Sequence, residues 1–409
     1  MVLTIFNPFK LCAQNFDVLL NATDDATLYE SSQGNIANSK GQYIFIGKTN
    51  NGDLRRTLIR FNLSTEIPSD ATIDSVFLSL SMNKTQNAAQ DLRIYPVLGA
   101  WEEGSSDASA STSAPTESAD LEQLFQALVL GVRDYAKKCG FQRALLGLSG
   151  GIDSALVAVI AAAALKADRV QALLMPSPWS SVGSIDDAEA LAERLGISTT
   201  TVPIQTLMQG FETTLTPALD QAPSGVTAEN LQSRIRGTLL MAVANQQGQL
   251  LLSTGNKSEL AVGYCTLYGD MNGGLAVIGD LYKSTVFSLC RWLDSSDAMA
   301  CRQELGLPEH SDLIGREILT KPPSAELRPD QQDSDSLPDY ATLDPLLNDL
   351  IEKHSSGTQL IAAGHDPADV KRIEQLFRRA EFKRRQAPPV LKVSRQAFGT
   401  GWRLPIAAR

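Results

Sequence analysis

The stretch 147–154, which reads Gly-Leu-Ser-Gly-Gly-Ile-Asp-Ser, constrains the fold of this chain more than any other. The apolar run 144–146 precedes it, and residues 155–165 are all Ala, Val, Ile or Leu. This pattern predicts a buried strand, a tight turn and a buried helix. Glycines let a backbone approach a phosphate closely, and the free amides and dipole of a helix start attract anions. We therefore predict a phosphate site formed by Gly147, Leu148, Ser149, Gly150, Gly151, Ile152, Asp153 and Ser154.

Asp153 narrows the kind of phosphate that this loop can bind. Its carboxylate would repel a bare phosphate but suits one that arrives with Mg²⁺, because carboxylates are common protein ligands of that ion. Two other glycine-loop motifs do not fit. A P-loop ends in Lys followed by Ser or Thr, and here the end is Asp153-Ser154. A dinucleotide fingerprint needs Gly where Ser149 stands. A plain strand-to-helix turn of small residues is the alternative interpretation.

The Ser-Gly-Gly-x-Asp-Ser pattern of 149–154 resembles the pyrophosphate-binding loop of the N-type ATP pyrophosphatases. Enzymes of that family split ATP between the α and β phosphates and adenylate a carboxyl or carbonyl oxygen. The resemblance implies ATP as a co-substrate of this chain.

Residues 1–105 differ in composition from the rest. They are rich in Asn, Thr, Ser and Gly, and their β-forming runs, separated by turn clusters, predict a small antiparallel β-sandwich. The runs are 43–46, 57–61, 76–82 and 92–97. The segment resembles the extracellular DNRLRE, or disaggregatase-related, β-sandwich modules at 56–61, 73–78 and 97–104, although the later strands of that family are not found after Gly104. Residues 106–118 are mostly Ser, Ala, Thr and Asp, which predicts a linker and a domain boundary.

Residues 119–409 alternate between helical and strand patterns. Apolar residues at helical spacing predict a helix from 121 to about 139. Further strands are expected at 170–175, 200–204 and 249–253, and further helices at 186–195 and 228–245. Alternating strands and helices imply an α/β fold with a doubly wound parallel sheet, whose ligands bind beyond the carboxyl ends of the strands. Because 147–154 and 253–259 both follow strands, we expect them to face one crevice, where Glu259 would add a second carboxylate to Asp153; a solvated first-turn glutamate is the alternative.

Composition excludes several other classes of protein. The formal net charge of −10 argues against a nucleic-acid binder. The five scattered cysteines and three histidines show no zinc or disulfide spacing. There is no apolar run of membrane-span length and no clear signal peptide, so we expect no membrane partner and a cytoplasmic location.

Beyond the loop, residues 119–409 closely resemble the synthetase domain of the NAD⁺ synthetase family, in its glutamine-dependent branch. The fold implied is that of the adenine nucleotide alpha hydrolases. The enzymes are ligases that amidate deamido-NAD⁺ (nicotinic acid adenine dinucleotide) to NAD⁺ through an adenylated intermediate, releasing AMP and pyrophosphate. The stretches that carry the resemblance are 147–154, 227–237, 253–270, 321–337 and 382–389.

The resemblance implies a role for each matching residue. The 147–154 loop binds ATP phosphates, and Asp153 and Glu259 are the Mg²⁺ ligands. Two further groups of residues bind the substrates: Thr254, Lys283 and Ser324 contact ATP, whereas Asn230 and Lys383 contact deamido-NAD⁺. Asp153 and Lys283 are expected to be catalytic, and we add Asp270 as a candidate for deprotonating ammonium. The family also implies a homodimer or a higher homo-oligomer.

One departure concerns the nitrogen source. The glutamine-dependent branch has a nitrilase-like glutaminase domain before the synthetase, and residues 1–105 hold only Cys12 and are too short for such a domain. We therefore expect an ammonia-dependent enzyme, with an external glutaminase as a possible partner. The alternatives are another N-type pyrophosphatase, such as a GMP synthetase or a tRNA-thiolating enzyme, or a carbohydrate- or wall-binding β-module fused to an inert synthetase domain.

Overall fold

The computed structural model describes residues 117–409, apart from 330, 336, 400, 401, 404, 405 and 407–409, and the backbone of seven strands before them. The chain divides into two compact units, Met1–Ala119 and Asp120–Arg409.

The strands of the first unit form two antiparallel sheets. One has the order β2-β1-β7 and the other β4-β3-β6-β5. Their bounds are β1 Val2–Phe6, β2 Val18–Asn21, β3 Asp24–Tyr29, β4 Ile36–Asn38, β5 Gly47–Lys48, β6 Leu54–Arg60 and β7 Ser75–Ser79. Two of the expected runs, 57–61 and 76–82, overlap β6 and β7. The other two, 43–46 and 92–97, lie outside the described residues, and the sandwich packing and the linker stay predictions.

The second unit is built on a five-stranded parallel sheet with the order β10-β9-β8-β11-β12. The strands are β8 Ala144–Gly147, β9 Val170–Leu174, β10 Ser198–Thr201, β11 Leu250–Ser253 and β12 Leu275–Ala276. The chain runs outward from β8 through β9 to β10, then returns to the other side of β8 with β11. The carboxyl ends of β8 and β11 are therefore neighbours at the point where the strand order reverses, the usual ligand position in such sheets. The prediction of a doubly wound parallel sheet is confirmed.

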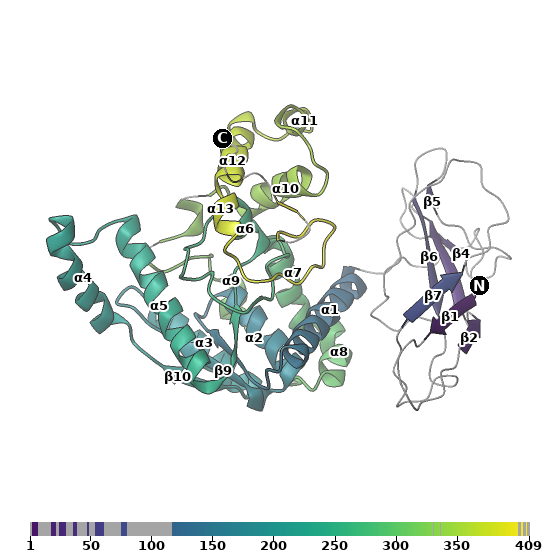
Figure 1. The fold of residues 1–409 in the computed structure, drawn as a ribbon, viewed down its shortest axis with the longest axis horizontal. Helices are drawn as coiled ribbons and strands as arrows, with labels where there is room; N and C mark the ends of the chain where they lie inside the picture. Colours follow the sequence, from purple (N-terminus) through teal and green to yellow (C-terminus); the bar gives the residue numbers. More distant parts are fainter. Residues whose placement is uncertain are drawn as a thin grey trace. The chain divides into compact units, whose positions relative to one another are not determined.

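Both faces of this sheet are covered by helices (Figure 1). Alternation along the strands decides which side chains meet which layer. Leu145 and Leu251 pack with Ala244 of α5 (Val226–Gln247) in one cluster. Leu146 and Leu252 face the other way, into the large core formed with α1, α2, α3 and α7. These helices are α1 Glu117–Lys138, α2 Ile152–Leu165, α3 Val182–Leu195 and α7 Lys283–Leu293.

The remaining helices complete the unit. The short helices around the sheet are η1 Ala167–Arg169, η2 Ser296–Ala298, α8 Met299–Glu304, α9 Arg316–Thr320 and η3 Asp333–Asp335, and α4 Gln205–Leu219 contacts α5. A separate cluster packs α6 (Lys257–Val262) with the C-terminal helices. These are α10 Tyr340–Ile351, α11 Gly357–Ala362, α12 Pro367–Arg379 and α13 Glu381–Arg384. Within the described part of the chain, none of the helices has both the length and the apolar character to cross a bilayer.

Several element boundaries differ from those expected: α1 begins at Glu117 rather than at 121, and α5 covers 226–247 rather than 228–245. Helix α3 begins at Val182 rather than at 186, because the Ser181 side chain accepts a hydrogen bond from the Ser184 amide and caps the helix earlier. Strand β10 covers 198–201 rather than 200–204, because its pairing with β9 ends at Thr201 and Pro203 has no amide to continue a ladder. Helix α4 and strand β12 were not expected from the sequence.

Candidate active site

The loop after β8 is held in its conformation by hydrogen bonds between its backbone and serine hydroxyls. The Ser149 amide donates to Ser154 Oγ at 3.2 Å, and Ser154 Oγ donates to the Gly151 carbonyl at 2.9 Å. Gly150 has a φ of +79°, and a Cβ there would lie 2.1 Å from the Ser184 carbonyl oxygen, so only glycine fits. Gly151 is the N-cap of α2 and makes no side-chain capping bond. The first amides of α2 are thus available to an anion.

A lysine and two carboxylates meet beside this loop. Lys283, the first residue of α7, forms a close ion pair with Asp153 Oδ2, and its Nζ lies 3.9 Å from Glu259 Oε1. Asn256 joins the two acidic residues, since its side chain donates to Asp153 Oδ1 at 3.0 Å and its amide donates to Glu259 Oε2 at 3.1 Å. Thr254 lies between β11 and Asn256. The structure therefore brings together Asp153 and Glu259, which the strand order placed in one crevice, and Lys283, which was assigned through the resemblance.

Burial and mutual charge perturb this group. Burial raises the pKa of Glu259 well above its usual range, the neighbouring Asp153 raises it further, and Lys283 opposes both. Burial alone would lower the pKa of Lys283, but the carboxylates of Asp153 and Glu259 more than offset it and raise that pKa. The two carboxylates therefore favour the charged form of Lys283 next to the loop after β8.

The donor set fits Mg²⁺ only in combination with a phosphate. Asp153 and Glu259 offer carboxylate oxygens and keep 18% and 19% of their side chains exposed. Among the described residues, no group of three or more His, Cys, Asp or Glu is arranged to bind a metal ion. Mg²⁺ is typically bound by one or two carboxylates, substrate phosphates and water. The carboxylates of Asp153 and Glu259, beside a loop with free helix amides, match that pattern.

A second cluster surrounds the loop 263–270. Thr266 donates its hydroxyl to Asn230 Oδ1 and its amide to Asp270 Oδ1, both at 2.8 Å. Lys383 Nζ donates to the carbonyls of Gly263 and Cys265 at 2.7 Å each. The three expected residues Asn230, Asp270 and Lys383 are therefore gathered around one loop, with Asn230 in α5 and Lys383 in α13. Desolvation by the surrounding protein raises the pKa of Asp270 to about 6, against the lowering effect of its hydrogen bonds. Asp270 is nevertheless one of the exposed residues of the fold, so solvent makes the rise in its pKa smaller.

Ser324 lies in the segment 321–335 and bonds within it, donating to the Gln331 carbonyl at 2.5 Å. Glu326 of the same segment accepts bonds from Ser184 Oγ at 2.5 Å and Ser181 Oγ at 3.1 Å. Because the Ser184 carbonyl faces Gly150, this segment is anchored next to the phosphate loop. Among the described residues, no contact joins Ser324 to Asp153 or Glu259.

With this geometry described, comparison with known proteins identifies the family. The NAD synthase family model matches residues 124–387. The chain belongs to the NAD synthase family. It is 58% identical over 288 residues to a glutamine-dependent NAD(+) synthetase of Synechocystis sp., covering 70% of this chain and 49% of that protein. It is 49% identical over 290 residues to one of Rhodobacter capsulatus, covering 71% and 52%. The chain thus spans about half the length of the curated relatives it matches.

Solved structures of this family share the fold. The NMN synthetase of Francisella tularensis superposes with a TM-score of 0.51 at 27% identity, covering 65% of this chain and 97% of that one. A glutamine-dependent NAD(+) synthetase from Cytophaga hutchinsonii has a TM-score of 0.57 at 20% identity, covering 70% and 54%, which supports the fold alone.

Sequence reasoning did not single out several residues that order this site. Asn256 and Glu259 form a capping box at the start of α6, which is a local Asn-x-x-Glu signal, but the bond from Asn256 to Asp153 has no local signal. Asp333 accepts a hydrogen bond from the Tyr340 hydroxyl at 2.8 Å. The charge of Asp333 raises the pKa of Lys283, and Lys283 Nζ lies over the Tyr340 ring.

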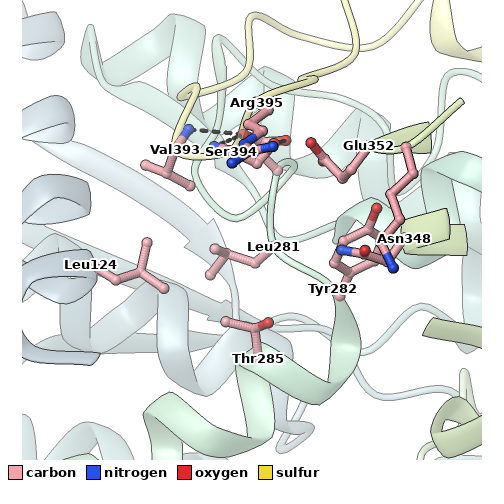
Figure 2. A pocket seen from close by; sticks show the side chains of 11 residues that line it. Leu124, Leu281, Tyr282, Thr285, Asn348, Glu352, Val393, Ser394 and Arg395 are labelled. Atoms are coloured by element: carbon pink, nitrogen blue, oxygen red, sulfur yellow. Dashed lines mark hydrogen bonds between the residues drawn. The ribbon is translucent and has the colours of Figure 1, made fainter. Parts of the chain in front are cut away.

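A buried ionic cluster lies next to the site, at the start of α6. Lys257, the first residue of α6, is fully buried, and its Nζ lies 2.9 Å from Asp280 Oδ1 and 2.6 Å from Glu352 Oε1. It also donates to Ser394 Oγ at 2.8 Å. Asp280, Glu352 and Ser394 line a cavity of about 430 Å³, and Figure 2 shows Glu352 and Ser394 near one another at its edge. This cluster connects α6, α10 and the C-terminal segment.

Proposed function

We propose that this chain is an ATP-dependent NAD⁺ synthase that amidates the pyridine carboxylate of deamido-NAD⁺, with release of AMP and pyrophosphate. The observation that carries the proposal is the meeting of Asp153, Glu259 and Lys283 beside a glycine phosphate loop, at the reversal point of the sheet. Family membership supports the same chemistry, since the relatives are glutamine-dependent NAD(+) synthetases.

In this proposal the residues act in two steps. The loop amides and Lys283 bind the β and γ phosphates and orient the α-phosphorus toward the pyridine carboxylate. Asp153 and Glu259 would bind Mg²⁺, which when present neutralises charge that develops on the leaving pyrophosphate. Thr254 and Ser324 contact ATP, whereas Asn230 and Lys383 contact deamido-NAD⁺. Asp270 takes a proton from ammonium, and ammonia then attacks the adenylated carboxyl carbon. The products are NAD⁺ and AMP.

The nitrogen donor and the wider assembly are also part of the proposal. We take ammonia as the donor for this chain, with a separate glutaminase as a possible source, and residues 119–409 as the enzyme. We propose a cytoplasmic homodimer or larger homo-oligomer. Support for self-association comes from exposed apolar side chains on α4 and α5, namely Leu207, Phe211, Leu219, Val226 and Met241.

One alternative substrate has support from a specific observation, the likeness to an NMN synthetase that covers nearly all of that protein. The test is ATP–pyrophosphate exchange by the purified chain with Mg²⁺. We expect exchange that requires deamido-NAD⁺. Exchange that instead requires nicotinic acid mononucleotide would favour the mononucleotide reaction, whereas exchange with XMP, or none with either pyridine nucleotide, would refute the proposed function.

A further inference from the structure

Asp344 of α10 is a buried carboxylate to which the proposed reaction gives no role. It is 3% exposed, and both of its oxygens are engaged by the site elements. Oδ1 accepts the Ser258 hydroxyl at 2.5 Å, and Oδ2 accepts the Ser284 amide at 2.7 Å. The Ser258 oxygen in turn accepts the Lys283 amide at 3.0 Å. One carboxylate therefore satisfies the first two amides of α7, one of them directly and the other through a hydroxyl.

This contact replaces a cap that α7 lacks. Its N-cap residue, Tyr282, makes no side-chain capping bond. The first amides of a helix need partners, and a negative charge near them is favourable because of the helix dipole. A capping residue usually lies in the same helix, whereas Asp344 follows Ser284 by 60 positions and belongs to another layer. The start of α7 is thus fixed by tertiary structure.

The elements that Asp344 joins are the ones that carry the site. Ser258 directly precedes Glu259 in α6, and Lys283 is the first residue of α7. The offset between these two helix starts determines whether Lys283 Nζ can lie against Asp153 while remaining 3.9 Å from Glu259. A shift of α7 by a fraction of its first turn would separate the lysine from the carboxylates.

We propose that Asp344 is a positioning residue for adenylation: through Ser258 and the start of α7 it fixes Lys283 between Asp153 and Glu259. This inference rests on the proposed function for its kinetic meaning. The same contacts also predict that Asp344 affects the binding of an ATP analogue with Mg²⁺. That prediction does not depend on which pyridine nucleotide is the substrate.

The experiment compares Asp344→Asn, Ser258→Ala, the double variant and a control. In Asp344→Asn the negative charge at the start of α7 is lost, and if the side-chain amide faces Ser258 it can only donate, so the Ser258 hydroxyl proton loses its acceptor. The control is Asp339→Asn, at the N-cap of the same helix, where Asp339 accepts the Thr342 amide at 2.8 Å and Asn caps equally well. Four quantities are measured: melting temperature, kcat of ATP–pyrophosphate exchange, KM for deamido-NAD⁺, and affinity for a non-hydrolysable ATP analogue with Mg²⁺.

We expect kcat and analogue affinity to fall about tenfold or more in Asp344→Asn, with KM for deamido-NAD⁺ within about twofold of wild type. Because both residues act through one relay, the double variant should lose little more than Asp344→Asn alone. If Asp344→Asn fails to fold, Ser258→Ala, which removes only the hydroxyl, carries the test alone. Unchanged kcat and analogue affinity in Ser258→Ala or in a folded Asp344→Asn would overturn the inference, as would additive losses. A wild-type chain with no exchange would refute the proposed function instead, and the analogue affinities would still decide the role of Asp344.

Discussion

Replacing Lys257 with Met should strongly destabilise the second unit, because it removes the only cation that touches Asp280 and Glu352 among the described residues. Lys257 and Asp280 have fully buried side chains, and Glu352 is 11% exposed. Methionine has a similar length and no charge, so it leaves two neighbouring carboxylates with hydrogen bonds alone. Asp280 keeps the amides of Val393 and Ser394, and Glu352 keeps the amide of Gln396.

Breaking a buried ion pair from one side costs about 3–5 kcal/mol of folding free energy. A typical domain has about 5–15 kcal/mol in total, so Lys257→Met should lose about a fifth or more of its stability. At about 2–4 °C per kcal/mol, the melting temperature should fall by roughly 6–20 °C.

The assay is urea unfolding followed by tryptophan fluorescence, supported by thermal melting. Lys353→Met is the matched control, because Lys353 lines the same cavity but is 65% exposed and pairs with Asp349 within one helical turn. Exposed pairs of this kind are worth about 0.5 kcal/mol or less. If Lys257→Met lost no more stability than Lys353→Met, the claim that the buried charges of this cluster depend on one another would be refuted.

Three further predictions concern the site. Asp153→Asn keeps the shape of the side chain but removes the charge that meets Lys283, so exchange should fall about 100-fold with an unchanged fold by circular dichroism; normal turnover at ordinary Mg²⁺ would contradict this role. Gly150→Ala should abolish ATP binding in a calorimetric titration and destabilise the chain, since its Cβ would meet the Ser184 carbonyl oxygen at 2.1 Å; Gly183→Ala is the control, because a Cβ there meets nothing within 4 Å. The pKa of Asp270 is raised to about 6, so its base form is present above that pH and lost as pH falls through it. At constant ammonium concentration, wild-type NAD⁺ formation should therefore fall as pH drops through this raised pKa, and Asp270→Asn should be slow and lack the inflection; an unchanged inflection in the variant would exclude Asp270 as the base.

The sheet and the acidic pair could be predicted from the sequence for one physical reason. In a parallel doubly wound sheet the polar loops after strands share an edge, so Asp153 after β8 and Glu259 after β11 had to lie close together once the strands were recognised. The Gly-Gly turn and the apolar runs are local signals, readable over a window of a few residues. Even there the boundaries of α3 and β10 moved, because a serine cap and a proline decided them rather than hydrophobic spacing.

The supporting residues could not be predicted in this way. Asn256 contacts Asp153 across 103 positions, and Asp344 contacts Ser258 across 86. Such hydrogen bonds depend on how helices pack, and they leave no periodic pattern in the chain. Lys283 was assigned only through the resemblance, since a charged residue at a loop is more often a solvated one. Tertiary packing, and not composition, converts these residues into a site.

The reversal of strand order between β8 and β11 has a consequence for how nucleotide affinity arises. The phosphate loop is complete by residue 154, yet the lysine that meets Asp153 follows 130 positions later. Strands β8, β9 and β10 can pair with one another before β11 exists, but the loop then has no Glu259 and no Lys283 beside it. Under the proposed function, a chain emerging from a ribosome would therefore form the loop long before Glu259 and Lys283 could help it bind ATP. If ATP is the substrate, as proposed, binding free energy that appears only with the last strands would stabilise the finished unit and not its intermediates.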